Sequence, residues 1–380
     1  MNNLESEKFE PIYYSNLDAT RFIAAFAVFL LHFSNEIRAI YPSLTETNWF
    51  NIFYLFAGKG GLGVNFFFVL SGFLITYLIL QERKNYNQFH LGRFLIRRSL
   101  RIWPLYFIVG GLGFFLFPLI FSEYYTLHQP TNYFLFLANF DEIWFGAMDP
   151  INFLTAPWSV AVEEQFYLFW GLSLFVLFKL GRINLLYFIL PLYLVSFWFR
   201  FEHWQEERIL YHHTIAVAQD ILTGAIIGFS LFNGKKWITW IHNLKPSWLL
   251  LGYLFGFALC ILKNRLFPGE LVIIERFVLS LFFGFIIIDQ VRNEKAIYPM
   301  GKIKPFNYLG KISYGLYMYH LVVMFLLNQY IDFSALPWYI GVVLYMFLSL
   351  GLTIGIASLS YHFIEAKFLS LKPKHRKHET

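Results

Sequence analysis

Ten separate stretches of this chain are long and apolar enough to cross a lipid bilayer, and this constrains the fold more than any other feature. A spanning helix needs about twenty mainly apolar residues, because hydrocarbon offers no hydrogen-bonding partner to an unpaired backbone group. Hydrophobic residues make up 57% of the 380 residues and charged residues only 14%, so little of the chain suits a water-soluble domain. We therefore predict an all-α polytopic membrane protein of about ten transmembrane helices. They are expected at 17–35, 62–81, 102–121, 160–178, 184–199, 209–232, 247–262, 271–289, 312–329 and 337–361.

The distribution of Lys and Arg predicts how these helices are oriented. With the N-terminus in the cytoplasm, 22 of the 30 Lys and Arg residues fall in inner segments and six in outer ones. This is the positive-inside pattern, so we expect both termini in the cytoplasm and a multi-pass protein of the inner (cytoplasmic) membrane. A further apolar segment, 131–140, is too short to span, and counting it as a span would place the basic tail outside. A re-entrant or interfacial segment is therefore expected there.

The chain is expected to form one membrane domain, residues 17–365, between a cytoplasmic N-terminal segment, residues 1–16, and a basic cytoplasmic tail, residues 366–380. The N-terminal segment lacks the basic start and the small-residue cleavage site of a signal peptide. Most of the basic residues serve the topology, so the net charge of +6 does not predict a nucleic-acid partner. The single cysteine, Cys260, excludes an intrachain disulfide.

The first apolar stretch contains two polar residues on one helical stripe. Arg21 and His32 are eleven residues apart, so in a helix both side chains point the same way, about 16 Å apart along its axis. An ionisable group in hydrocarbon costs about 2.5 to 3.5 kcal/mol, which favours a cavity or a partner for each of them. The alternative is an arginine that extends to the membrane surface and a histidine packed in the core.

A second polar group lies where the fourth stretch is expected to enter the membrane from outside. Ser159, Glu163 and Glu164 are then at its outer end, at a depth similar to that of His32. A carboxylate bonded to one imidazole nitrogen raises the basicity of the other, as a general base for a hydroxyl requires. Glu163 is therefore the candidate partner of His32. The alternative is that both carboxylates are solvated at the membrane surface or cap the start of the helix.

Four arginines lie on the inner side of the third stretch: Arg93, Arg97, Arg98 and Arg101. Their spacing places at least three of them on one helical face, and a guanidinium binds phosphate through two parallel hydrogen bonds. The cluster therefore predicts a docking site for a phosphorylated ligand. Anchoring of the helix at an anionic leaflet explains the same residues equally well.

The other buried polar groups are expected to pack helices together. Ser71 and Gly72 fall near mid-membrane, where small side chains allow another helix or a ligand to approach closely. Asp220 and Arg276 lie in different stretches, and we expect them to neutralise each other in a structural role. No set of His, Asp and Glu residues has metal-ligand spacing, so no metal site is predicted.

Taken together, these segments resemble the acyltransferase 3 family of integral membrane proteins, which O-acylate extracytoplasmic glycans and some small molecules. The resemblance covers residues 17 to about 370, with the motifs in the family's order. The matching residues are Arg21 and His32; Phe67, Phe68, Ser71 and Gly72; Arg97, Arg98, Arg101, Pro104 and Tyr106; Ser159, Glu163, Gln165, Phe166 and Tyr167; Asp220 and Gly224; Ser313, Tyr314, Tyr317 and His320; and Glu365. One departure is Asn65, which stands where many relatives carry Asp.

The resemblance implies transfer of an acyl group, expected to be acetyl, from cytoplasmic acyl-CoA to a hydroxyl of an extracytoplasmic or membrane-associated glycan or glycolipid. His32 would act as the general base or as a transient acyl carrier, with Glu163 orienting it and Arg21 stabilising charge. Some relatives continue into an SGNH hydrolase-like domain, for which this chain is expected to be too short. The acyl group would then pass directly to the acceptor or through a separate envelope protein.

The same resemblance assigns the remaining polar groups to the donor and to a cavity. The residues expected to bind the donor phosphates are Arg97, Arg98 and Arg101. The residues expected to line the cavity or to stabilise an oxyanion are Ser71, Ser159, Tyr317 and His320. Acyl-CoA would be a substrate, so no permanently bound cofactor is expected, and the other partners are the acceptor and the lipid bilayer.

A transporter or flippase of a lipid-linked saccharide is the alternative function, because ten spans with internal charges also suit movement of a lipid across the membrane. Such a protein is expected to have two similar halves with paired broken helices, and the sequence shows no internal symmetry of that kind. A third candidate, a non-catalytic sensor of lipid or glycan, would not consume the acyl donor.

Overall fold

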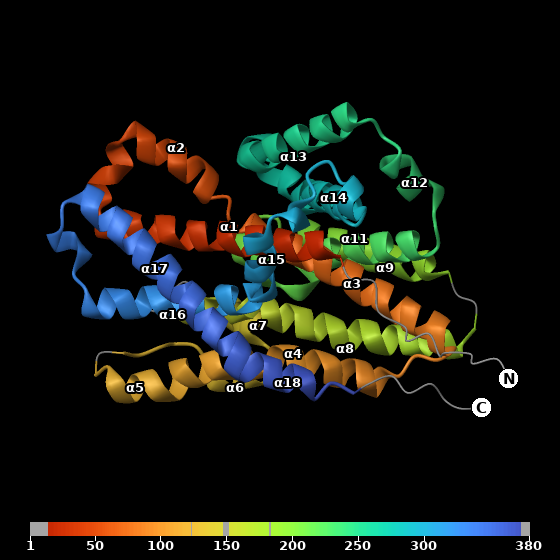
Figure 1. Ribbon diagram of the computed structural model, residues 1–380, viewed down its shortest axis with the longest axis horizontal. Coiled ribbons are helices and arrows are strands. Elements are labelled where there is room, and N and C mark those ends of the chain that lie inside the picture. Colours follow the sequence, from red (N-terminus) through yellow and green to blue (C-terminus); the bar gives the residue numbers. More distant parts are fainter. Residues whose placement is uncertain (1–13, 123, 147–151, 182–183, 374–380) are drawn as a thin grey trace.

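The computed structural model describes residues 14–122, 124–146, 152–181 and 184–373, and within these ranges the chain forms helices and turns without any strand. The predicted all-α fold is therefore confirmed. Figure 1 shows many of the long helices running roughly along the longest axis of the molecule. The long helices are α1 (Ser15–Ile40), α3 (Leu62–Tyr86), α4 (Leu91–Gly111), α8 (Pro157–Lys179), α9 (Leu185–Glu202), α11 (Thr214–Phe232), α13 (Pro246–Leu266), α14 (Val272–Gln290), α16 (Ser313–Tyr330) and α17 (Trp338–Ser360).

Nine helical stretches of the described chain are long and apolar enough to span a membrane, and a bent pair adds a tenth. The pair consists of α15 (Lys304–Lys311) and α16, which meet at 72°. Each of the ten predicted stretches corresponds to one of these, so about ten transmembrane helices are confirmed. The remaining helices are α2 (Asn48–Ala57), α5 (Phe117–Ile120), α6 (Pro130–Phe134), α7 (Ala138–Trp144), α10 (Glu207–His212), α12 (Lys236–His242) and α18 (Ala366–Ser370). Most of the predicted N-terminal segment and the end of the tail lie outside the described residues, and the cytoplasmic placement of both termini stays a prediction.

The apolar segment 131–140 does not form a span. It contains most of α6 and the start of α7, with Phe136 between them in a left-handed conformation (φ 56°). Gln165 of α8 donates hydrogen bonds to the Phe136 carbonyl at 2.7 Å and to the Asn139 side-chain oxygen at 2.8 Å. A short segment whose polar groups are bonded to a neighbouring helix fits the expectation of a re-entrant or interfacial piece.

Helices α3 and α11 pack closely because glycines lie where their backbones meet. A Cβ atom at Gly224 would be 1.9 Å from the Val69 carbonyl oxygen, and one at Gly72 would be 1.9 Å from the Ile221 carbonyl oxygen. Small residues of this kind allow backbones to approach, which is a main source of helix association in lipid. The predicted close approach at Gly72 is therefore made by a helix, and it fixes the part of α3 that carries Ser71.

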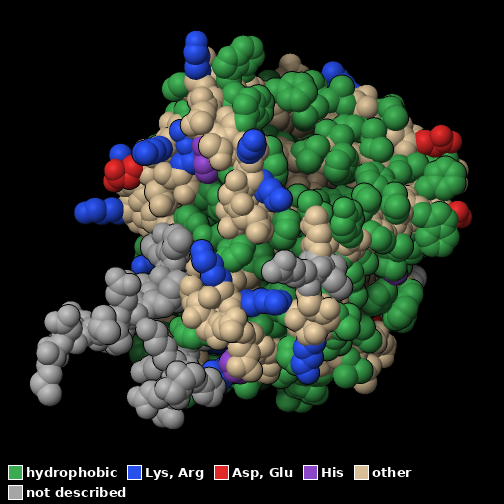
Figure 2. Space-filling view, turned by 90° about the vertical axis from the view of Figure 1, so that its right-hand side faces the viewer, with side chains coloured by type: hydrophobic (Ala, Val, Ile, Leu, Met, Phe, Trp, Pro, Cys, Tyr) green, Lys and Arg blue, Asp and Glu red, His purple; other side chains and the backbone are tan. Residues whose placement is uncertain are grey.

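One end of the molecule is predominantly basic. Figure 2 views this end, where Lys and Arg side chains are spread over the surface and acidic side chains are few. The start of α1, the end of α3, the first half of α4 and the residues after α18 come together here, because their side chains line a single cavity. These are segments for which the positive-inside pattern predicts a cytoplasmic location.

Replacing Gly224 with Ala should destabilise the fold by about 1 to 3 kcal/mol, because the new methyl group would collide with the backbone of α3. Thermal unfolding of the purified protein in detergent would show this as a lower Tm. Gly351→Ala in α17 is the matched control, since a Cβ atom there meets nothing within 4 Å, and its Tm should be unchanged or slightly higher. Equal Tm values in the two variants would contradict tight packing of α3 on α11.

Candidate functional site

A cavity of about 670 Å³ opens at the basic end of the molecule, and we call it the vestibule. It lies between the start of α1, the end of α3, the first half of α4 and the C-terminal residues around α18. Its lining contains twice as many basic as acidic side chains, so it attracts anions. The basic residues are Arg21, Arg97, Arg98, Arg101, Lys311 and Lys372, and the acidic residues are Asp18, Glu82 and Glu365.

Two arginines of the vestibule are held by carboxylates. Arg97 donates to Glu82 at 2.6 Å, and Arg21 forms an ion pair with Asp18, one turn earlier on α1. Each carboxylate neutralises its arginine and limits how far the guanidinium can turn toward a ligand. Glu82 was not singled out from the sequence, where it is one acid in a basic stretch; only the fold brings it to Arg97.

Arg98 and Arg101 are not held in this way. Among the described residues, no carboxylate lies within ion-pair distance of either guanidinium. The Arg98 guanidinium lies 5.8 Å from the ring centres of Phe94 and Tyr167, and its Nε is buried without a hydrogen-bond partner. These two arginines are therefore the members of the predicted phosphate cluster with donors left for a ligand.

Lys372, two residues after α18, reaches the same vestibule. Burial, together with the positive charges of Arg101, Arg98 and Arg97, lowers the pKa of Lys372 from 10.5 to about 8. The side chain is mostly charged at neutral pH and becomes neutral at mildly alkaline pH. Nothing in the charge pattern of the tail distinguishes Lys372 from its basic neighbours, because only the fold brings it close to Arg101.

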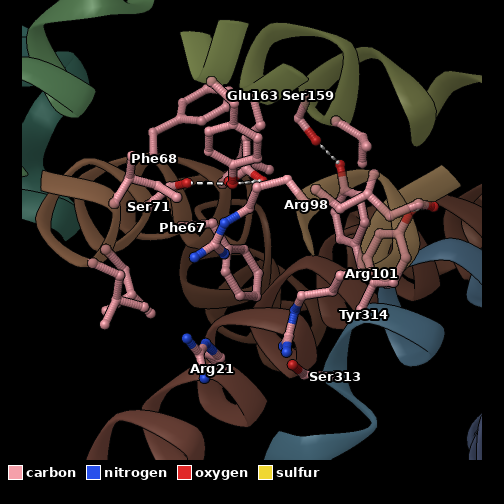
Figure 3. A pocket seen from close by; sticks show the side chains of 18 residues that line it. Arg21, Phe67, Phe68, Ser71, Arg98, Arg101, Ser159, Glu163, Ser313 and Tyr314 are labelled. Carbon is pink, nitrogen blue, oxygen red and sulfur yellow. Dashed lines mark hydrogen bonds between the residues drawn. The ribbon is translucent and has the colours of Figure 1, made fainter. Parts of the chain in front are cut away.

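A smaller cavity of about 120 Å³ adjoins the vestibule on its inner side, and we call it the inner cavity. The two cavities share Arg21, Arg98 and Arg101 among their lining residues. Figure 3 shows the Arg98 guanidinium between Glu163 on one side and Arg21 on the other. The predicted site residues that line the inner cavity are Arg21, Ser71, Arg98, Arg101, Ser159, Glu163 and Tyr317.

Glu163 ends a chain of three hydrogen-bonding groups. Tyr167, one turn further along α8, donates to Glu163 at 2.8 Å, and the Ser71 hydroxyl lies 2.5 Å from the Tyr167 hydroxyl. The Tyr167 hydroxyl has one hydrogen and donates it in the hydrogen bond to the carboxylate. The Ser71 hydroxyl is therefore the donor in its hydrogen bond with the Tyr167 oxygen. Glu163 is thereby fixed at the inner cavity, where Arg98 and Arg21 are among its electrostatic neighbours.

Ser159 and Tyr317 form a second pair of this kind. The Tyr317 hydroxyl donates to the Ala156 carbonyl at 3.0 Å, so the Ser159 hydroxyl, 2.8 Å away, donates to the Tyr317 oxygen. Ser71 and Ser159, which were expected to stabilise an oxyanion, thus both donate hydrogen bonds to tyrosines in this structure. They line the inner cavity, and stabilisation of an oxyanion by them stays a prediction.

The predicted partnership of Glu163 with His32 is not found. Among the described residues no hydrogen bond joins the two, and Glu163 shares its cavity with Arg21, which lies about 16 Å along α1 from His32. The reason is the short segment containing α6 and α7, which packs against α8 at Gln165. The first turns of α8 are therefore enclosed by protein, and Glu163 lies at the inner cavity.

His320 of α16 is the residue that lies beside His32. The two ring centres are 5.1 Å apart, and the rings are inclined at 52°. His320 is 1% exposed. Its Nδ1 donates a hydrogen bond to the Tyr317 carbonyl at 2.6 Å. In this tautomer Nε2 is an acceptor, and it has no hydrogen-bond partner. His320 lines neither the vestibule nor the inner cavity; its ring lies beside that of Tyr317, with 5.9 Å between ring centres, and its role at an oxyanion stays a prediction.

Asp220 of α11 and Arg276 of α14 lie together, as expected from the sequence. Arg276 donates to Asp220 at 2.6 Å, and both side chains are buried. Neither residue lines the vestibule or the inner cavity, so the pair serves to join two spanning helices. In the described part of the chain, no group of three or more His, Cys, Asp or Glu residues is arranged to hold a metal ion.

Comparisons with known proteins match almost the whole chain. The sequence model of the family described as "Acyltransferase domain" matches residues 14–362. A protein of Staphylococcus aureus strain COL, named "Putative O-acetyltransferase", is 28% identical over 384 residues, and O-acetyltransferase OatA of strain NCTC 8325 is 27% identical over 379 residues. Each alignment covers 94% of this chain but 57% of the relative, so the chain spans little more than half their length. No solved structure matches the chain significantly.

Replacing Arg276 with Met should destabilise the fold by about 3 kcal/mol or more, because it leaves the Asp220 carboxyl buried without its partner. The double variant with Asp220→Leu should recover much of this loss. Denaturation of the protein in mixed micelles measures both. Lys263→Met is the control, since it breaks the partly exposed pair with Glu275 and should cost about 1 kcal/mol or less. Equal losses from Arg276→Met and Lys263→Met would argue against a buried pair.

Proposed function

We propose a specific reaction for this chain, which belongs to the acyltransferase domain family: it transfers an acyl group, with acetyl preferred, from cytoplasmic acyl-CoA to a hydroxyl of an extracytoplasmic or membrane-associated glycan or glycolipid. The names of the similar proteins support acetyl as the group and oxygen as the acceptor atom. The enzyme would lie in the cytoplasmic membrane with its vestibule facing the cytoplasm, as the distribution of Lys and Arg favours.

The observation that carries the proposal is that the cationic vestibule adjoins the inner cavity and shares its arginines. Acyl-CoA has phosphates at one end and a thioester at the end of a long, flexible arm. Arg98 and Arg101, which form no ion pair with a carboxylate of the described residues, suit the phosphates. The narrower inner cavity, lined by Ser71 and Glu163, suits the arm and its thioester. Glu163 in the inner cavity and Arg21, which lines both cavities, would keep the Arg98 guanidinium oriented.

His32 and His320 would act on the acceptor. His32 takes the proton of the acceptor hydroxyl, and the hydroxyl oxygen attacks the thioester carbonyl carbon; the carbon–sulfur bond breaks, and the proton passes to the CoA sulfur. His320 has a bare Nε2 beside His32, so it can accept a proton or fix the ring of its neighbour. Tyr317 lines the inner cavity and its ring lies beside that of His320, so the thioester and the acceptor would meet near Tyr317.

The first test is consumption of acetyl-CoA by purified protein in vesicles, with the labelled acetyl group followed into acid or acceptor. The wild-type protein should turn over the donor, and His32→Ala should lower the rate by about 100-fold or more, because a general base contributes a factor of that size. His362→Ala, an exposed histidine outside both cavities, should leave the rate unchanged. A transporter, flippase or sensor would leave acetyl-CoA intact. Unchanged turnover in His32→Ala would remove His32 from the mechanism.

Within the arginine cluster, Arg98→Gln and Arg101→Gln should each weaken donor binding by about tenfold, because each removes a charge-assisted contact to phosphate. Arg93→Gln should have no such effect, since Arg93 belongs to the same cluster in sequence but does not line the vestibule. Titration of the purified protein with a non-hydrolysable acyl-CoA analogue measures the Kd. Equal Kd values in all three variants and the wild type would leave these arginines as topology anchors.

Donor affinity should fall as pH rises from 7 to 9. The pKa of Lys372 is lowered to about 8, so its charge is present below that pH and lost above it, and the vestibule then attracts the phosphates less. The expected change in Kd is roughly threefold to tenfold. In Lys372→Met this pH dependence should disappear, and in Lys372→Arg the affinity should stay high across the range. A pH profile that is the same in wild type and Lys372→Met would exclude Lys372 from donor binding.

A further inference from the structure

A third cavity, of about 290 Å³, lies between α1, α3, α13 and α14, and we call it the lateral groove. Thr20, Ala24 and Ala27 form its wall on α1, and because they are spaced by four and three residues, they lie on one face over about 10 Å. Around the axis of α1, the centre of this face lies about 100° from the Arg21 side chain. The groove is therefore separate from the vestibule and the inner cavity.

The lateral groove exists because α13 is attached on one side only. Among the candidate spans of the described chain, α13 has the smallest fraction of buried residues, 22% over an apolar window of 18 residues. It packs on α14 through glycines, with Gly252 against Phe285 and Gly256 against Phe282. Figure 1 shows α13 at the edge of the molecule, beyond α14. Its side toward α1 is therefore not filled by protein.

The lateral groove opens to the lipid. Phe56 and Phe257 line it and are 55% and 54% exposed, so its rim reaches the surface that a bilayer would cover. The other lining residues are almost all apolar, among them Cys260. An apolar space that opens into hydrocarbon has no polar partners for water, and its walls lose dispersion contacts if it is left empty. A hydrocarbon chain supplies those contacts.

A positive charge lies at one end of the lateral groove. Lys59 is part of its lining, and no carboxylate of the described residues forms an ion pair with it. Lys263 and Glu275 are its electrostatic neighbours, but they pair with each other at 2.7 Å. The group therefore carries one net positive charge, which matches one phosphodiester.

We propose that the lateral groove binds one anionic phospholipid of the surrounding bilayer, with an acyl chain between α1 and α13 and its phosphate against Lys59. The lipid would connect α13 to α1 across the lateral groove. The proposal does not depend on the acyltransferase reaction, because none of the residues that form the groove lines the vestibule or the inner cavity.

Native mass spectrometry of the full chain, incubated with equal amounts of phosphatidylglycerol and phosphatidylcholine, tests this. The wild-type protein should retain one phosphatidylglycerol. Ala27→Phe, which fills the groove, should lower retention at least fivefold, and Lys59→Gln should lower the preference for phosphatidylglycerol about fivefold, the factor expected for one basic residue at a membrane surface. Leu254→Phe, at a residue of α13 that is 58% exposed and outside the groove, is the matched control and should retain lipid as the wild type does.

Cys260 gives a second measurement, because it is the only thiol in the chain and lines the lateral groove. Phosphatidylglycerol should slow its alkylation by N-ethylmaleimide in the wild type and much less in Lys59→Gln. Ala27→Leu replaces Ala27→Phe if the larger residue prevents folding. Wild-type retention in the filled variant, an unchanged lipid preference in Lys59→Gln, or capture of an isoprenyl phosphate from native membranes in place of a phospholipid would each overturn the proposal.

Discussion

The cost of placing a guanidinium in hydrocarbon governs how this protein is built. Most of its buried or partly buried arginines are matched to acceptors by the protein itself: Arg21 to Asp18, Arg97 to Glu82, Arg276 to Asp220, and Arg200 to backbone carbonyls. Arg98 and Arg101 are different, because they line the cavities without forming an ion pair with a carboxylate of the described residues. Because these two guanidiniums line the vestibule and have donors left for a ligand, the vestibule is the centre of the proposed function.

The polar groups around the inner cavity form two layers. On one side, Ser71, Tyr167 and Glu163 are linked beside Arg98, and on the other, Ser159 and Tyr317 are linked beside His320. In each layer, one tyrosine accepts a hydrogen bond from a serine and donates its own hydroxyl hydrogen bond to a fixed acceptor. Fixed donors and acceptors of this kind hold the lining of the inner cavity in one geometry, because rotating one of these side chains would leave a buried group without its partner.

Much of the architecture could be predicted from the sequence, and the errors have one origin. The ten spans, the short segment at 131–140 and the pairing of Asp220 with Arg276 follow from length, apolar composition and the cost of a lone buried charge. Glu163 was assigned to His32 because both were given a depth by counting helices. That count assumes a helix that starts at the membrane surface, whereas the segment of α6 and α7 encloses the start of α8.

The sequence by itself determined that this chain crosses the membrane about ten times and that its cationic cluster, its first-span histidine and its buried ion pair exist, because these depend on hydropathy and on the energy of single charges in lipid. Tertiary structure alone decided which arginines stay unpaired, that His320 is the neighbour of His32, that Lys372 reaches the vestibule, and that a groove remains beside α13. These features depend on contacts between helices far apart in the chain. The sequence pattern of a helix determines which of its faces is polar, but it does not determine which other helix packs against that face.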